Sequence, residues 1–158
     1  MGFQIMFDQA NSFYLCAHLC EKELDRQPGR HDLYSTPMIV NSAFACEVYI
    51  KTLLDFYNIP AGKKHNLDDL FQLLPDEVKD SITKNDCSLS GRMTDAFGLS
   101  LLKAVSDAFV TWRYSYEKST LSCDVGFLKT LTKVLQAECA SRLYGLTWEQ
   151  YCKLARIN

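Results

Sequence analysis

The sequence has few residues that interrupt regular structure, and it lacks the motifs of several common enzyme classes. Only four Pro and seven Gly occur among 158 residues, which excludes a collagen-like or proline-rich low-complexity chain. There is no Gly-rich phosphate loop, no GxSxG nucleophile motif and no HExxH zinc motif. Only three His are present, His18, His31 and His65. Catalysis that depends on several imidazoles is therefore severely limited.

The sequence also lacks long hydrophobic runs and an excess of one charge. No stretch reaches the roughly 18 apolar residues of a membrane span, and the first residues have neither the basic start nor the apolar core of a signal peptide. Seventeen Lys and Arg face nineteen Asp and Glu, so a nucleic-acid role would need a local basic patch. We therefore expect a soluble, cytoplasmic protein without membrane contact.

The seven cysteines are odd in number and include no CxxC pair. Cys16 and Cys20 would be neighbours on one helix, but His18 would point well round that helix from both. We therefore interpret the cysteines as reduced, mostly buried thiols, and we expect neither a metal site nor a cofactor.

Apolar residues recur at helical spacing, and no strand-like alternation is present. The first helix contains residues 6–24 and ends at the breaker-rich segment 26–32. The second is predicted to begin with Thr36 as its cap and Pro37 in its first turn, and to end at Asn58. It is apolar on two sides, which is typical of the central helix of a bundle.

The second half of the chain is predicted to be helical as well. Two short helices meet at Pro75, the first of them capped by Asn66, and a loop follows at 85–92. A third long helix runs from about Thr94 to Glu117. Its predicted buried face contains Leu101, Val105, Ala108, Trp112 and Tyr116.

The last part of the chain carries clear helix boundaries. A fourth long helix runs from about Asp124 to Leu143, with Phe127, Leu131, Val134 and Leu135 as its apolar residues. Gly145 can end it, and Thr147 with Gln150 forms a capping box for a short terminal helix. The prediction is a single all-α domain over 1–158, an up-and-down four-helix bundle with extra short helices.

Arg113 and Glu117 are the most conspicuous polar pair. They lie four residues apart on the predicted helix, among Trp112, Tyr114 and Tyr116, so they would share one face. Arginine with aromatic rings can hold phosphates and stack bases. The alternative interpretation is a partly buried ion pair with tyrosine packing.

Glu47 is the second polar candidate, because it falls between the two apolar stripes of its helix. A buried acid needs a partner. Lys51, one turn later, is one partner, and Arg113 on the neighbouring long helix is the other, so we expect an interhelical Glu47–Arg113 pair. His65 lies at a helix start, with Lys63 and Lys64 beside it as a loose basic group.

Three strings resemble motifs of the HEPN superfamily of small α-helical proteins. They are PMIVNSAFACEVYIKTLL, GKKHNLDDLFQLLP and FVTWRYSYE, in this order within 36–118. The resemblance implies a four- or five-helix bundle, often a homodimer. Many members are metal-independent ribonucleases of toxin–antitoxin, abortive-infection and other defence systems. Others are non-catalytic RNA- or partner-binding modules, often beside a nucleotidyltransferase.

One departure from the family pattern affects the expected activity. Catalytic members carry Arg and then His four to six residues later. Arg113 matches that Arg, but Lys118, Ser119 and Thr120 stand where the His is expected, and no His follows His65. Lysine is a poor base near neutral pH.

The sequence therefore favours a HEPN-like binding or regulatory module in a bacterial defence or toxin–antitoxin context. Its ligand would be RNA, a nucleotide or a partner protein, and Arg113 would lie in a cleft between two helices or two subunits. One alternative is a divergent metal-independent endoribonuclease, in which Arg113 holds a phosphate and Glu117, Tyr116 or His65 moves protons. The other is a structural dimerisation protein. The predicted binding residues are Glu47, Lys51, His65, Trp112 and Tyr114.

Overall fold

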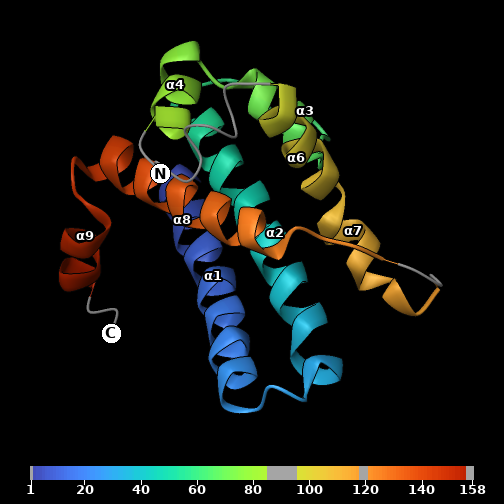
Figure 1. Ribbon diagram of the computed structural model, residues 1–158. Coiled ribbons are helices and arrows are strands. Elements are labelled where there is room, and N and C mark those ends of the chain that lie inside the picture. The colour runs from blue at the N-terminus through green and yellow to red at the C-terminus, as the bar shows by residue number, and fades with distance from the viewer. Residues whose placement is uncertain (1, 85–95, 118–120, 156–158) are drawn as a thin grey trace.

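Every regular element in the described part of the chain is a helix (Figure 1). The computed structural model describes residues 2–84, 96–117 and 121–155. The helices are α1 (Gly2–Arg26), α2 (His31–Phe56), α3 (Leu67–Leu73), α4 (Asp76–Lys84), α6 (Ala96–Ser106), α7 (Ala108–Arg113), η1 (Ser115–Glu117, a 3₁₀ turn), α8 (Val125–Tyr144) and α9 (Trp148–Ala155). The predicted all-α class is confirmed. The predicted loop at 85–92 lies outside the described residues.

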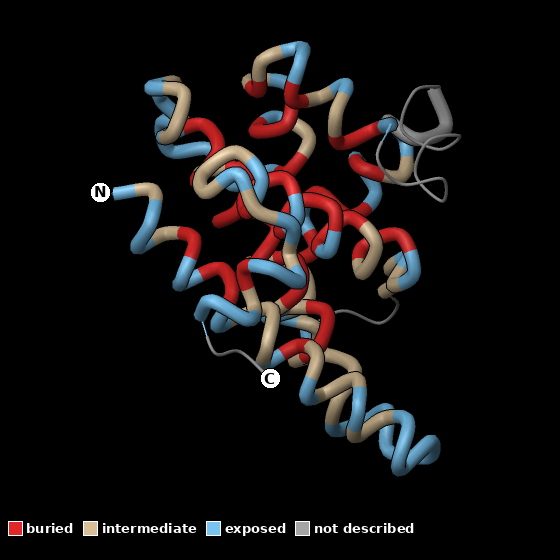
Figure 2. The backbone as a smooth tube through the Cα atoms, turned by 90° about the vertical axis from the view of Figure 1, so that its left-hand side faces the viewer, coloured by how far each residue is buried: buried red, intermediate tan, exposed pale blue. Residues whose placement is uncertain are grey.

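Helix α2 is the centre of the fold, as its two apolar stripes predict. It forms a hairpin with α1 and also packs against α3, α7 and α8 (Figure 1). Ala45, Cys46, Tyr49, Ile50 and Leu53 are all fully buried on it. Figure 2 shows the buried segments gathered in the interior, whereas the tip of the α1–α2 hairpin is exposed.

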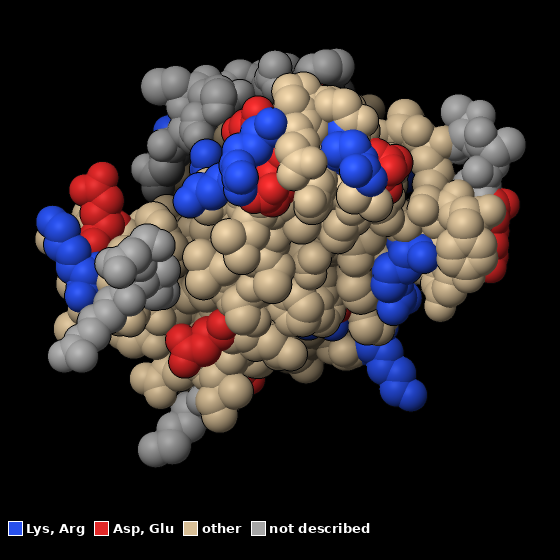
Figure 3. All heavy atoms as spheres, turned by 90° about the horizontal axis from the view of Figure 1, so that it is seen from below, with Lys and Arg blue, Asp and Glu red and all other residues tan. Residues whose placement is uncertain are grey.

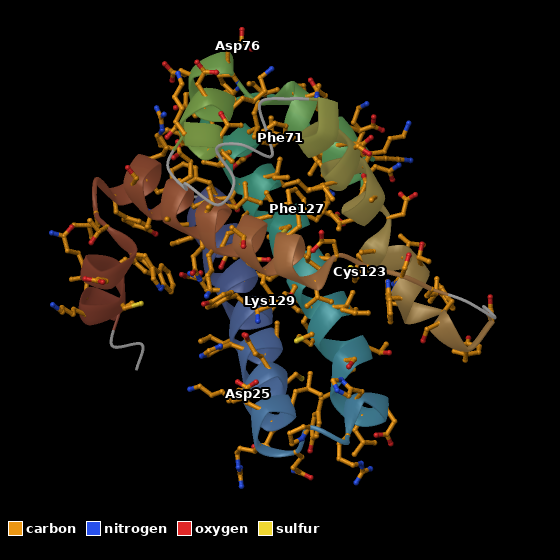
Figure 4. All side chains as sticks on the ribbon, in the orientation of Figure 1. Asp25, Phe71, Asp76, Cys123, Phe127 and Lys129 are labelled. Atoms are coloured by element: carbon orange, nitrogen blue, oxygen red, sulfur yellow. The ribbon has the colours of Figure 1, made fainter. Side chains whose placement is uncertain are left out.

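Helix α8 also contributes to the core, where it packs against α2. Its predicted apolar residues Phe127, Leu131, Val134 and Leu135 are all buried. Phe127 and Phe71 of α3 lie in this interior, near α2 (Figure 4).

A buried polar network joins α1, α2 and α8. The Tyr49 hydroxyl donates to Asn11 Oδ1 at 2.7 Å, and Gln136 Nε2 donates to the same oxygen at 3.1 Å and to the Tyr49 hydroxyl at 2.9 Å. These bonds compensate the Tyr49 hydroxyl, Asn11 Oδ1 and Gln136 Nε2 for the loss of water, whereas the buried Asn11 Nδ2 has no hydrogen-bond partner among the described residues. The network therefore fixes how the three longest helices face one another.

The predicted start of the second helix is wrong. Helix α2 begins at His31, so Pro37 lies in its interior and Thr36 is not its cap. A proline lacks the N–H that would bond to the carbonyl four residues earlier. Here that carbonyl belongs to Leu33 in the first turn of α2, so the loss falls near the helix start. Separately, Asn41 Nδ2 donates to the Pro37 carbonyl at 2.7 Å. The helix ends at Phe56, two residues before the predicted end, and Asn58 then takes a left-handed φ of 57°.

The prediction of one long helix over 94–117 is also wrong, because the helix is interrupted at Asp107. The break follows Ser106, whose hydroxyl accepts the Asp68 backbone N–H at 3.1 Å and donates to the Asp68 carboxylate. On either side of it the two pieces have different neighbours: α6 packs against α3, whereas α7 packs against α2. Helix α7 then ends at Arg113.

Most of the predicted helix ends in the remaining segments are confirmed. Asp124 caps α8 by accepting the Phe127 N–H at 2.8 Å, and Gly145 ends it with a left-handed φ of 66°. Thr147 and Gln150 exchange the two bonds of the capping box, at 2.8 and 3.2 Å. Asn66 occupies the cap position of α3, but its side chain makes no capping bond. Among the described helices none is both long and apolar enough to span a membrane.

Candidate functional site

Arg113 lies on the surface at the end of α7, with its guanidinium over an aromatic ring. Its Cζ is 4.3 Å from the centroid of the Phe109 ring and 5.4 Å from that of Tyr114. Cation–π contacts of this kind are worth about 0.5–1 kcal/mol at exposed sites. The contacts hold the guanidinium plane in place without using its N–H groups, and Arg113 forms no ion pair with any residue that the structure describes.

Phe109 is itself held in a row of rings. It stacks on Phe44 of α2 at 4.5 Å with an interplanar angle of 18°, and Phe44 meets Phe13 of α1 edge-on, also at 4.5 Å. All three rings are partly buried against the core. This aromatic row, Phe13–Phe44–Phe109, therefore supports Arg113 from three different helices.

Two exposed tyrosines follow Arg113 directly. Tyr114 is 44% exposed and Tyr116 is 78% exposed, and their rings meet edge-on with centroids 6.3 Å apart. The predicted burial of Tyr116 is wrong, because the helix ends before it and η1 turns it outward. Trp112 is partly buried against the core. We call the set Arg113, Tyr114 and Tyr116 the Arg113 surface.

The two ion pairs predicted for Arg113 are not formed. Glu117 is exposed, and because α7 ends at Arg113, the two residues are not one helical turn apart. Glu47, the other predicted partner, is bonded elsewhere. Arg113 is exposed on the surface, and the surface hollows described below do not include it.

Glu47, Lys51 and His65 form a second cluster, on α2 and the segment before α3. One carboxylate oxygen, Glu47 Oε1, accepts hydrogen bonds from Lys51 Nζ and from His65 Nδ1, both at 2.8 Å. The Glu47 side chain is only 3% exposed and that of His65 is 59% exposed. The predicted Glu47–Lys51 pair is confirmed, whereas the contact with His65 was not predicted.

Glu47 Oε2 is buried and has no hydrogen-bond partner among the described residues. Lys63 and Lys64, next to His65 in the chain, are exposed and form no hydrogen bond or ion pair with another residue that the structure describes. An exposed imidazole bonded to a buried carboxylate thus directly follows two lysines that have no ion-pair partner in the described part of the chain.

A surface hollow with a volume of about 520 Å³ lies elsewhere, between α8 and the start of α9. Its lining includes Lys133, Ala137, Leu146 and Trp148. A smaller one of about 180 Å³ lies beside Lys51 and the turn at Pro60. No group of three or more potential metal ligands occurs within the described ranges.

Sequence reasoning missed the residues that support the predicted ones. Phe109 lies four residues before Arg113, so helical spacing alone could have placed its ring beneath the guanidinium. Phe44 and Phe13 had no such signal, because they reach the site from other helices. The bond between His65 and Glu47 spans eighteen positions of the chain and depends on the path of the turn between them.

A scan against protein-family models, a search of curated proteins and a search of solved structures each found no match for this chain. The resemblance to the HEPN superfamily therefore depends on the three sequence motifs.

Proposed function

We propose that this protein is a binding module that holds single-stranded RNA on the Arg113 surface. The observation that carries the proposal is the exposed guanidinium over Phe109, whose N–H edge has no partner among the residues that the structure describes. Such an edge suits the two oxygens of a phosphate. Tyr114 and Tyr116, next to it, offer exposed rings on which bases can stack.

The surface charge favours a short contact of limited strength. The net charge is −2, and in the view of Figure 3 cations and anions are interspersed around an uncharged area. A protein that neutralises only a few phosphates has a shallow dependence of affinity on salt. Stacking would then contribute a large share of the binding free energy.

The family resemblance supports a wider proposal. In this proposal the protein is a HEPN-like bundle that forms a homodimer in the bacterial cytoplasm and acts in a defence or toxin–antitoxin system. The missing His in the Arg motif favours binding over cleavage, since the positions where it would stand hold Lys118, Ser119 and Thr120. These three residues lie outside the described part of the chain.

The test is fluorescence anisotropy of a labelled single-stranded RNA, in EDTA, with the wild type and single variants. We expect Arg113→Ala and Tyr116→Ala each to weaken binding about tenfold or more, because a charged hydrogen bond and one stacked base are each worth on the order of 1–3 kcal/mol. Arg113→Lys should not restore binding, since an ammonium lacks the flat, bidentate edge.

The matched control is Arg26→Ala, which removes another exposed arginine, one paired with Glu23 on α1. It should leave the affinity unchanged. Equal losses in the Arg26 and Arg113 variants would show that the loss of a positive charge, and not the Arg113 surface, explains the weaker binding. Absence of binding by the wild type would contradict the proposal. The same samples run on a denaturing gel separate binding from cleavage, and cleavage by the wild type would favour the ribonuclease alternative.

A further inference from the structure

The three histidines of the chain have different surroundings. His65 Nδ1 lies 2.8 Å from the buried carboxylate of Glu47. His18 Nδ1 lies 3.5 Å from Glu21 Oε2, a partly exposed carboxylate that also pairs with Lys129. His31 is exposed, and its Nδ1 is 3.3 Å from the Ser35 hydroxyl. Only His65 has a short bond to a carboxylate that water does not reach.

This bond sets which nitrogen of His65 is free. Glu47 Oε1 can only accept, so Nδ1 must carry a proton, and the other nitrogen, Nε2, then holds a lone pair in the neutral ring. The Glu47 side chain is 3% exposed and the His65 side chain 59% exposed, so solvent reaches the imidazole far more than the carboxylate. Lys51 Nζ, 2.8 Å from the same oxygen, offsets the charge of Glu47, so the bond does not require a charged imidazole.

We propose that His65 is a phosphoryl-acceptor residue, with Nε2 as the nucleophile and Glu47 as its positioning residue. The donor is of the phosphoramidate class, in which phosphorus is bonded to nitrogen. The Nε2 lone pair forms a bond to phosphorus, and the P–N bond of the donor, whose nitrogen is protonated, breaks. The nitrogen takes the electron pair of that bond and leaves as a neutral amine. The ring keeps its Nδ1 proton, and the hydrogen bond to Glu47 stabilises the positive charge that develops on it.

The neighbouring cations suit a phosphoryl group. Lys63 and Lys64 are exposed, precede His65 directly and have no partner among the described residues. Both are therefore available to approach the oxygens of a donor or of the modified imidazole. This inference does not depend on the Arg113 surface or on RNA binding.

The test uses potassium phosphoramidate as the phosphoryl donor and the intact folded chain. Acid-labile phosphate on each histidine is followed with time by mass spectrometry of peptides prepared at alkaline pH. We expect His65 to react about tenfold faster than His31. Glu47→Gln should slow His65 about tenfold, the effect of losing one charge-assisted hydrogen bond, and should leave His31 unchanged.

Glu21→Gln is the matched control, because it alters the carboxylate beside His18 and should not change the rate at His65. Similar rates at all three histidines, no reaction at His65, or an unchanged His65 rate in folded Glu47→Gln would each overturn the proposal. If Glu47→Gln does not fold, the proposal is tested on the wild type by a ¹⁵N spectrum of the imidazoles. The spectrum must show His65 protonated at Nδ1. Protonation at Nε2 alone would overturn the proposal.

Discussion

At the scale of single residues, burial controls the chemistry of the thiols. Cys46 is completely buried, and the loss of water around its thiol raises its pKa to about 12, despite a contact with Thr132 Oγ1 at 3.1 Å. Burial also raises the pKa of Cys139 well above its ordinary value. Cys16, in contrast, is exposed on α1. The prediction of mostly buried thiols therefore holds for some of the cysteines only.

This difference predicts the order of alkylation. With iodoacetamide near pH 8, Cys16 should react within minutes, whereas Cys46 and Cys139 should stay unmodified until the chain unfolds, because the thiolate is the reactive form. Mass spectrometry of peptides from native and urea-treated protein gives the order. Labelling of Cys46 at the rate of Cys16 in the native protein would contradict the buried position of α2.

The candidate site shows what can be predicted about residues. Types and positions along the chain were enough to select Arg113, the tyrosines beside it and the Glu47–Lys51 pair, since these depend on spacing within one segment. Of the two partners predicted for Glu47, Lys51 is confirmed and Arg113 is wrong. Arg113 was expected on a continuous helix. Whether Arg113 is exposed depends on where α7 ends, and no residue between 107 and 117 is a proline or glycine that would mark that end.

At the scale of elements, helix ends were predictable where side chains or glycine determine them. Asp124, Gly145 and the Thr147–Gln150 box mark the boundaries of α8 and α9 in the sequence itself. The break at Asp107 was not predictable, because it depends on the contact between Ser106 and Asp68 of α3. Capping side chains and glycine near a helix end therefore determine some helix boundaries, and contacts between helices determine the others.

Gly145 allows a direct test of one such end. Its φ is 66°, in the left-handed region, where a Cβ is unfavourable whatever the free space. We expect Gly145→Ala to lower the free energy of unfolding by about 1 kcal/mol, as measured by urea denaturation. Gly126→Ala, in the first turn of α8, is the control: it has helical geometry with only an ordinary contact at 3.5 Å, and it should stabilise the protein by about 0.5–1 kcal/mol.

The contact between α1 and α8 predicts a dependence on pH. Partial burial raises the pKa of Glu21, but the hydrogen bond and charge of Lys129, with a smaller contribution from His18, outweigh it and hold this pKa below its ordinary value. Lys129 extends from α8 near α1 (Figure 4). A carboxyl with a lowered pKa stabilises the folded state above its unfolded pKa, and this stability is lost as the pH falls through the folded pKa.

Between about pH 7 and about pH 3, the free energy of unfolding should therefore fall less in Lys129→Met than in the wild type. The difference should be less than about 1 kcal/mol, because the pair is partly exposed. Urea denaturation of both proteins at the two pH values measures the difference. Lys84→Met is the control, since it removes an exposed lysine that pairs with Asp80 within α4. An equal change in both variants would show that net charge, and not the α1–α8 contact, is responsible.

At the scale of the whole molecule, stability depends on how the core joins distant segments. The Asn11–Tyr49–Gln136 network connects three helices inside the apolar interior. We expect Tyr49→Phe to lower the free energy of unfolding by about 1–2 kcal/mol, because the hydroxyl both donates and accepts there. Calorimetry measures the loss. Tyr116→Phe, at a 78% exposed position, should be neutral, and an equal loss in both variants would argue against the network.

Hydrogen bonds between distant segments also affect the order in which the chain can fold during its synthesis. Asn11 accepts a bond from Gln136, 125 positions later, and Asp8 accepts one from the Tyr151 hydroxyl, 143 positions later. The first helix therefore leaves the ribosome long before two of its partners have been translated. Such long separations slow folding and leave apolar surface uncovered meanwhile. A nascent chain stalled before residue 125 should accordingly be a good client for chaperones, whereas the released protein should not.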